Sequence, residues 1–258
     1  MSTEIKQKAP LVSVIMPAYN AEPFIREAIA SVQAQSLSDW ELLVIDDGSQ
    51  DTTRSVVTGY TESDQRIQLI VNPENLGVAK TRNRGMDLFR GQYVAFLDSD
   101  DYWEPQMLEK MVAKAIETHA DIIYCSYMLV DETGKKVCND FLVPPKTTFE
   151  ESIVRSVITC STVLVTAELA RHHRFPTDMY HEDIAMWFQI LRDGGIACGV
   201  EDVLAAYRQR SGSRSASKIK SACRRWNIYR DHLKLPLAKS VLVMIRYAYY
   251  GVLKFKRL

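Results

Sequence analysis

Three carboxylates near the middle of the chain have the types and spacing of metal ligands. Residues 93–97 are apolar and favour a buried strand, and Asp98, Asp100 and Asp101 follow with no basic residue among them. Because like charges repel, these acids are either spread into water or gathered on a hard divalent cation, which takes oxygen ligands. Asp101 also fits a simpler role, capping a helix that opens near Glu104. That role leaves Asp98 and Asp100 unexplained.

A second acidic site lies much later in the chain. His181, Glu182 and Asp183 open an amphipathic helix whose apolar positions continue to residue 191. Acids in a first helical turn are stabilised by the helix dipole, so capping explains them as well as catalysis does. The residues alone leave both roles open.

The first half of the chain alternates short apolar strands with amphipathic helices. Strands are expected at residues 11–16, 40–45, 67–71 and 92–97, and helices at 22–35, 52–61 and 78–89. Strict alternation predicts a doubly wound, mostly parallel sheet covered on both faces. In such sheets ligands bind beyond the carboxyl ends of the strands. Polar clusters follow all four strands, at residues 17–20, 46–51, 72–75 and 98–101, and we expect them to meet in one crevice.

Fewer regular elements are expected in the second half of the chain. Residues 122–130 read as a strand, and residues 131–135 as a hairpin turn into a second strand at 136–143. A helix is expected near residues 149–156 and a strand at 161–166. The five cysteines are scattered and have no Cys-x-x-Cys spacing, which indicates free thiols in a reducing compartment. The first ten residues have no apolar segment of signal-peptide length.

The zero net charge hides a strong asymmetry. From Leu204 onward there are 14 Lys and Arg and one acid, Asp231, whereas 18 basic and 31 acidic residues precede this point. Such a split indicates an anionic partner for the tail, either nucleic acid or a membrane surface.

Four ordered motifs resemble the family 2 glycosyltransferases. They are Val14-Ile15-Met16-Pro17-Ala18-Tyr19-Asn20, Val44-Ile45-Asp46-Asp47-Gly48-Ser49-Gln50-Asp51, Asn75-Leu76-Gly77-Val78-Ala79-Lys80-Thr81-Arg82-Asn83 and Phe96-Leu97-Asp98-Ser99-Asp100-Asp101. The resemblance covers residues 11 to 210. It implies the α/β GT-A fold, with a nucleotide-sugar-binding half (11–103) and an acceptor half (104–215) in one catalytic domain.

The resemblance also implies site residues. Asp100 would bind a divalent metal, Mn²⁺ or Mg²⁺, and Asp98 the ribose or the metal. Arg82 would lie near the donor phosphates or brace Asp98. The residues implied in donor nucleotide binding are Pro17, Ala18, Tyr19, Asn20, Asp47, Lys80, Arg82, Asp98 and Ser99, with Asp47 favouring a uracil-type base.

The acceptor half carries the remaining implied roles. The pair Glu182-Asp183 resembles the family's Glu-Asp motif, which makes Asp183 the general base of an inverting displacement and gives Glu182 a positioning role. Arg208, Arg210 and Arg214 resemble a mobile loop that closes on the donor diphosphate. Many relatives have a histidine where this chain has Arg210. This departure argues against a third metal ligand from the protein and favours direct charge pairing of Arg210 with the diphosphate. A solvated basic linker is the alternative for this segment.

The C-terminal residues 216–258 predict membrane-associating helices. Apolar positions from Leu237 to Leu253 form a stripe, interrupted by Arg246 and shorter than the ~20 residues that span a bilayer. Basic residues gather beside it, which is typical of a helix lying on an anionic cytoplasmic leaflet. The alternatives are packing on the catalytic body or on a second copy. No nucleic-acid reader motif accompanies the basic residues.

The favoured function is an inverting glycosyltransferase of bacterial surface-polysaccharide synthesis. It would move a sugar from a nucleoside-diphosphate sugar, with UDP preferred, to a lipid-linked or glycan acceptor. It would be cytoplasmic and peripheral on the inner face of the membrane, and could form a homodimer. Two alternatives are a nucleotidyltransferase, whose usual Gly-rich loop after the first strand is missing here, and a non-catalytic scaffold, which would not need both Asp100 and Asp183.

Overall fold

The computed structural model describes residues 8–210 and 218–255. Strands and helices alternate in the first half, as the sequence predicts. The elements are β1 (Val12–Ala18), α1 (Ile25–Gln33), β2 (Trp40–Asp46), α2 (Thr53–Ser63), β3 (Ile67–Val71), α3 (Val78–Leu88) and β4 (Tyr93–Phe96). Every residue of β1 and β2 is buried. Their continuous apolar sequences arise because helices cover both faces of the sheet.

The second half adds shorter elements and one long strand. They are β5 (Tyr102–Trp103), α4 (Met107–Thr118), β6 (Ile122–Val130), β7 (Lys146–Thr147), α5 (Phe149–Arg155), the 3₁₀ turn η1 (Cys160–Thr162), β8 (Val163–Thr166), α6 (Ala167–His172), α7 (Glu182–Arg192) and β9 (Ala197–Arg208). The five cysteines are all free.

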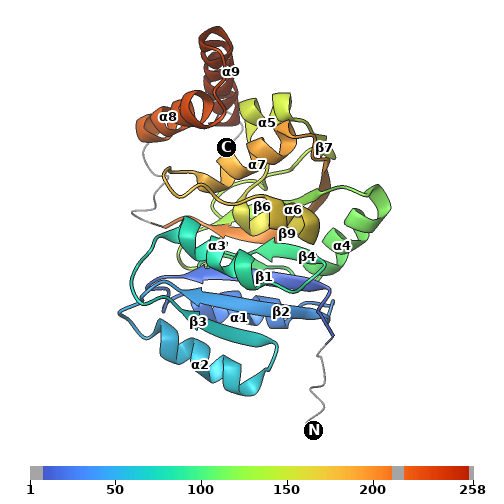
Figure 1. The fold of residues 1–258 in the computed structure, drawn as a ribbon, viewed down its shortest axis with the longest axis vertical. Coiled ribbons are helices and arrows are strands. Elements are labelled where there is room, and N and C mark those ends of the chain that lie inside the picture. Colours follow the sequence, from blue (N-terminus) through green and yellow to red (C-terminus); the bar gives the residue numbers. More distant parts are fainter. Residues whose placement is uncertain (1–7, 211–217, 256–258) are drawn as a thin grey trace.

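One mixed sheet passes through the molecule in the order β3-β2-β1-β4-β8-β6-β9-β5, and β7 pairs with β9 (Figure 1). β1 is parallel to both β2 and β4, and β2 is parallel to β3. The chain therefore moves outward from β1 to β3 and then crosses to the other side of β1. A reversal of this kind leaves a crevice at the carboxyl ends of the strands.

Helices cover both faces of this sheet. α1, α2 and α4 contribute to one apolar cluster, and α3, α6 and α7 to a second on the opposite face. β1 pairs with β4 only as far as Ile15. It therefore continues past the end of β4 and carries Pro17 and Ala18 to the edge of the crevice.

The turn expected after β6 forms, but the regular strand expected at 136–143 does not. Asp131 N–H donates to Lys135 O at 2.9 Å, and residues 136–143 contact β6 through two isolated antiparallel bridges, Tyr127 with Phe141 and Val130 with Lys136. β6 pairs along its length with β9, in parallel. Sequence analysis missed β9 because Glu201 and Asp202 interrupt its apolar run. The pairing skips from Val200 to Val203, so these two acids bulge out of the ladder into solvent.

The helix-cap role expected for Asp101 is wrong. Tyr102 and Trp103 form β5 against β9, and the helix begins only at Met107. Gln106 precedes it without a side-chain capping bond. Asp101 is therefore held in the sheet layer, before the helix begins.

The tail forms α8 (Lys218–Asn227), the π-helical turn η2 (Ile228–His232) and α9 (Leu237–Phe255), which lie beyond α5 and α7 at one end of the molecule (Figure 1). A third apolar cluster joins Ile153 of α5 and Phe188 of α7 to Tyr229 and Val243. Packing on the catalytic body, one of the alternatives that the sequence left open, is therefore confirmed for this face of the tail. The helices that the structure describes include none that is long and apolar enough to cross a bilayer.

Candidate active site

A cavity of about 820 Å³ lies beyond the carboxyl ends of β1, β2 and β4. Most of the site residues expected from the sequence line it: Pro17, Ala18, Tyr19, Asp47, Arg82, Asp98, Ser99, Asp100, Glu182, Asp183, Arg208 and Arg210. Asn20 and Lys80 are not among its lining residues, and Lys80 is exposed on α3. Arg214 lies outside the described residues. The two acidic sites of the sequence thus meet in one cavity.

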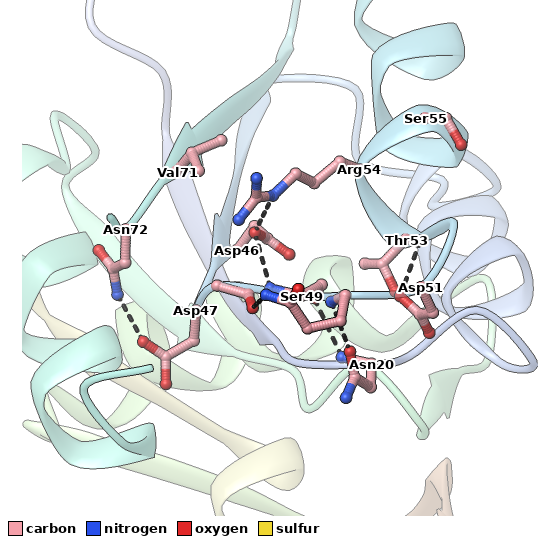
Figure 2. A network of polar contacts seen from close by, with 12 residues as sticks. Asn20, Asp46, Asp47, Ser49, Asp51, Thr53, Arg54, Ser55, Val71 and Asn72 are labelled. Atoms are coloured by element: carbon pink, nitrogen blue, oxygen red, sulfur yellow. Dashed lines mark hydrogen bonds and ion pairs between the residues drawn. The ribbon is translucent and has the colours of Figure 1, made fainter. Parts of the chain in front are cut away.

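Asp47 anchors the loop that follows β3. Its Oδ1 accepts a hydrogen bond from Asn72 Nδ2 at 2.7 Å (Figure 2). Leu76 N donates to the same oxygen at 2.9 Å, and Gly77 N donates to Oδ2 at 2.9 Å. Gly77 has a φ of 86°, a conformation that glycine adopts without strain. Asp47 therefore fixes the cavity wall, and contact with a nucleobase stays a prediction.

Asn20 joins the loops after β1 and β2. Its backbone N–H donates to Ser49 Oγ at 3.0 Å, and its side-chain Oδ1 accepts from Gln50 N at 2.8 Å (Figure 2). The neighbouring Asp46 accepts from Arg54 Nε at 2.6 Å and Ser49 N at 3.2 Å. These contacts give Asn20 a supporting position behind the cavity.

The three acids after β4 have different partners. Asp98 is paired with Arg82, Asp100 with Arg210 at 3.3 Å, and Asp101 accepts from Ser161 Oγ at 2.5 Å and Arg208 N at 2.8 Å. Burial, followed by repulsion from neighbouring acids, raises the pKa of Asp100 and of Asp101. Asp100 and Asp101 are among the six acids that line this cavity, and each ionises at a cost that a bound cation would offset.

A divalent cation fits Asp98 and Asp100. The described residues contain no cluster of three or more His, Cys, Asp or Glu side chains able to hold a metal by themselves. Mg²⁺ commonly binds through one or two carboxylates, with substrate phosphates and water completing its shell. Asp101 is buried and both of its carboxylate oxygens accept hydrogen bonds, whereas Asp98 and Asp100 are partly exposed and each pairs with an arginine through one oxygen. Asp98 and Asp100 are therefore the carboxylates that could hold the metal of a metal–diphosphate complex.

Arg82 connects the two acidic sites. It is only 3% exposed, and its guanidinium donates to Asp98 Oδ1 at 2.5 Å and to Glu182 Oε1 at 2.9 Å. Burial alone would lower its pKa, but the surrounding acids, Asp98 first, raise it well above the ordinary value. The buried guanidinium therefore stays charged and fixes the start of α7 relative to the end of β4.

Asp183 has the electrostatics of a general base. Burial, and then the charge of Glu182, raise its pKa to about 6, while Arg82 opposes the rise. The preceding His181 has a φ of 62°, which turns the chain sharply into α7. Asp183 is thus ionised at neutral pH but basic enough to accept a proton.

Arg208 is not part of a loop, in contrast to the sequence-based expectation. It ends β9, and its buried guanidinium donates to the carbonyl oxygens of Asp100, Asp131 and Glu132 and pairs with Glu27. Arg208 therefore supports the backbone at Asp100, in the acidic segment after β4, and at residues 131–132. Arg210 is exposed and is the last residue described before the gap at 211–217.

Several lining residues were not singled out as site residues from the sequence. They include Asn75, Gly77, Tyr127, Thr159, Cys160, Tyr180 and Arg224. Asn75 and Gly77 lie inside one of the four family motifs, and Tyr180 lies two residues before Glu182. Their closeness in sequence to expected site residues could have indicated these three. No local signal marks Tyr127 or Arg224, which tertiary packing brings to the cavity from β6 and α8.

Solved structures with the same architecture define the fold. The chain superposes on residues 1–349 of TarS from S. aureus in complex with UDP-GlcNAc with a TM-score of 0.73, at 22% identity, over 92% of this chain and 71% of that one. The mannosyltransferase PcManGT from Pyrobaculum calidifontis, in complex with GDP-Man and Mn²⁺, gives a TM-score of 0.65 at 21% identity, over 94% and 70% of the chains. The fold is GT-A.

Sequence comparison gives the family. The profile described as "Glycosyl transferase family 2" matches residues 13–139. TuaG from Bacillus subtilis, a glycosyltransferase assigned provisionally to teichuronic acid biosynthesis, is 34% identical over 95% of this chain and 97% of its own. The Escherichia coli UDP-Glc:alpha-D-GlcNAc-diphosphoundecaprenol beta-1,3-glucosyltransferase WfgD is 34% identical over 95% and 94%. The chain belongs to the family 2 glycosyltransferases.

Proposed function

We propose that this enzyme transfers a hexose from a UDP-sugar to a lipid-linked sugar, with inversion, during synthesis of a bacterial surface glycan. The full-length match to WfgD supports a UDP donor and a diphosphate-linked acceptor. The match to TuaG supports a cell-surface product. The identity of the sugar and the linkage stay outside this proposal.

The residues divide the reaction between two sides of the cavity. Asp183 accepts the proton of the acceptor hydroxyl while that oxygen attacks the anomeric carbon. The bond from the anomeric carbon to the diphosphate oxygen breaks, and the nucleoside diphosphate leaves with the electron pair. A divalent metal bound with the donor supplies neutralisation of the leaving diphosphate. Glu182 and Arg82 hold Asp183 in place, and Arg210 is the exposed cation beside Asp100 that can pair with phosphate oxygens.

The observation that carries this proposal is that Asp98, Asp100 and Asp183 line one cavity. Asp183→Asn keeps the size of the side chain but removes the base. We expect this variant to bind UDP with wild-type affinity by calorimetry and to lose at least ~10²-fold in transfer rate, since general-base catalysis contributes on that scale. Wild-type turnover in the variant would refute the assignment.

The nucleotide is tested separately. A thermal-shift comparison of UDP, GDP and CDP with Mg²⁺ or Mn²⁺ should give the largest rise in melting temperature with UDP, because ligand binding to the folded state stabilises it. Asp100→Asn should remove the metal-dependent part of that rise. An equal metal-dependent rise in Asp100→Asn and wild type would remove Asp100 from the metal site.

We further propose that α9 places the enzyme on the anionic inner leaflet of the cytoplasmic membrane. One face of α9 packs on the body, and the opposite face leaves Leu237, Val241, Leu242, Ile245 and Tyr249 exposed. Arg246 and Lys239 border this apolar stripe. The domain division at residue 216 is part of this proposal, although η2 and α9 share an apolar cluster with α5 and α7.

A further inference from the structure

Tyr207 of β9 is a partly buried residue of the active-site cavity. It pairs in register with Leu129 of β6, which lines the same cavity. The centroid of its ring lies 6.1 Å from that of Tyr127, whose ring in turn stacks on Phe141 at 4.9 Å. Strand pairing and ring packing therefore hold the phenol at a fixed place in the cavity wall.

The hydroxyl of Tyr207 makes no hydrogen bond within the described parts of the chain, and it is not one of the sealed polar atoms that lack a partner there. Tyr124 differs, because its hydroxyl donates to the carbonyl oxygen of Pro144 at 3.0 Å. Tyrosine hydroxyls in protein interiors usually find such a partner. The hydroxyl of Tyr207 is instead open to the cavity, where it can donate to a ligand and accept from it.

Carboxylates from both acidic sites act on this hydroxyl. Burial, followed by the charges of neighbouring acids, raises the pKa of Tyr207 above its ordinary value, and these acids are, in order of effect, Asp101, Asp98, Asp183 and Asp100. The next residue fixes β9 beside the first site, since Arg208 N donates to Asp101 Oδ1 at 2.8 Å. The phenol is thus protonated and neutral at neutral pH, within reach of the charges after β4 and of Asp183 in α7.

The transferred sugar must lie where these two acidic sites meet. In the proposed reaction its anomeric carbon loses the diphosphate on the side of Asp98 and Asp100, and receives the acceptor oxygen on the side of Asp183. Phosphate oxygens are negative, whereas the hydroxyl groups of a hexose are neutral donors and acceptors. A neutral phenol among carboxylates suits a sugar hydroxyl better than a phosphate, because the acids repel further negative charge.

We propose that the hydroxyl of Tyr207 hydrogen-bonds to a hydroxyl group of the transferred hexose and so orients the anomeric carbon toward Asp183. This inference rests on the proposed function and adds to it a residue that contacts the donor sugar. The nucleotide and the diphosphate are common to all UDP-sugars, so a residue that contacts the hexose can distinguish among them. A site that bonds a particular sugar hydroxyl discriminates against a sugar that lacks it.

The experiment compares the affinity of a UDP-sugar with that of UDP itself, by calorimetry on the full chain with Mg²⁺ and without acceptor. UDP-glucose, UDP-galactose, UDP-GlcNAc and UDP-GalNAc are first titrated into wild type, and the tightest binder becomes the probe. Tyr207→Phe keeps the ring and removes only the hydroxyl. We expect this variant to bind the probe about twofold to tenfold more weakly, the scale of one neutral hydrogen bond, and to bind UDP as wild type does.

The melting temperature of Tyr207→Phe separates substrate contact from a structural role. It should not fall, because no hydrogen bond among the described residues is lost. Tyr102→Phe is the matched control. Tyr102 of β5 lies opposite Ala206, is partly buried like Tyr207, and is not among the residues that line the cavity. Its substitution removes the same group from the neighbouring strand, so both affinities should keep their wild-type values.

Three outcomes would overturn the contact with the sugar. They are an unchanged ratio of probe to UDP affinity in Tyr207→Phe, an equal loss for UDP and the probe in that variant, and a loss of the same size for the probe in Tyr102→Phe. Failure of the proposed function would look different, because wild-type protein would then bind none of the four UDP-sugars.

Discussion

Asp183 is partly buried beside the acid Glu182, and desolvation followed by the charge of Glu182 raises its pKa to about 6. The base must be ionised to accept a proton, so we expect the transfer rate to be constant above this pH and to fall about tenfold per unit below it. The measurement is a profile of kcat against pH at saturating substrates. A profile that is flat down to pH 5 would contradict the assignment of Asp183 as the base.

The same raised pKa has a consequence for stability. The pKa of Asp183 is higher in the folded chain than the ordinary value of 3.8, so its ionisation costs folding free energy. That cost begins as pH rises above about 4 and is complete above about 6. Asp183→Asn should therefore raise the free energy of unfolding at pH 8 by on the order of 2 kcal/mol.

Urea denaturation at two pH values checks this expectation. The difference between Asp183→Asn and wild type should shrink as the pH is lowered from 8 to 4, because wild-type Asp183 becomes protonated in the folded state. A variant that is less stable than wild type at pH 8 would show that the charged carboxylate contributes to folding, opposite to the direction inferred from its burial.

Arg82 stabilises the folded chain, in contrast to the ionised Asp183, because its positive charge compensates the two acids Asp98 and Glu182. Arg82→Met leaves Glu182 and Asp98 without their shared cation, and breaking a buried pair in this way costs about 3–5 kcal/mol. The double variant Arg82→Met with Glu182→Gln should recover part of that loss in urea denaturation. Equal stability of the single and double variants would mean that Glu182 does not depend on Arg82.

At the scale of elements, β9 depends on a close approach to residues 144–145. Gly199 donates its N–H to Pro145 O at 2.9 Å, and a Cβ at Gly199 would lie 2.2 Å from Pro144 O, a backbone atom that cannot turn aside. Gly199→Ala should therefore destabilise the protein by more than about 1 kcal/mol through overpacking. The measurement is the urea midpoint.

Gly59 in α2 is the matched control for this change. No atom lies within 4 Å of a Cβ built there, and alanine is a better helix former than glycine. Gly59→Ala should raise stability by about 0.5–1 kcal/mol. If both alanine variants shifted the urea midpoint in the same direction, the close contact at Gly199 would not explain the effect of the substitution there.

At the scale of the whole molecule, two exposed isoleucines separate membrane contact from general surface hydrophobicity. Ile245 of α9 is 62% exposed and Ile116 of α4 is 61% exposed. We expect Ile245→Asp to reduce flotation with anionic vesicles severalfold, because a charge opposes insertion of the apolar stripe. Ile116→Asp should leave flotation unchanged, and both variants should fold like wild type since neither side chain is buried.

Equal flotation of the Ile245 variant and wild type would refute the membrane role of this stripe. Loss of self-association in that variant, measured by sedimentation, would assign the stripe to a second copy instead. High salt should weaken vesicle binding of the wild type as well, because the exposed Arg246 contributes through a charge that salt screens.

The order of elements in the first half follows from local patterns. β1, β2 and β3 are runs of apolar residues ended by Asn, Asp and Gly, and α1 and α3 have helical spacing of their buried positions. These signals lie within a few residues of one another, so the sequence could predict them. The placement of Asp98 and Asp183 in one site followed from a family resemblance, because no local pattern relates residues so far apart.

Tertiary structure decided what depends on distant contacts. β9 is a strand because β6 pairs with it despite the exposed acids Glu201 and Asp202, and its last residue Arg208 became a buried support rather than part of a loop. Arg224 lines the cavity from α8, whose neighbouring Arg225 lies over the ring of Phe188 in α7. The sequence by itself determined the alternation of strands and helices and the polar ends of the strands, since these depend on neighbouring residues. Only folding determined which charges are buried, paired or presented to a ligand, because burial and pairing arise from segments that the chain brings together across long separations.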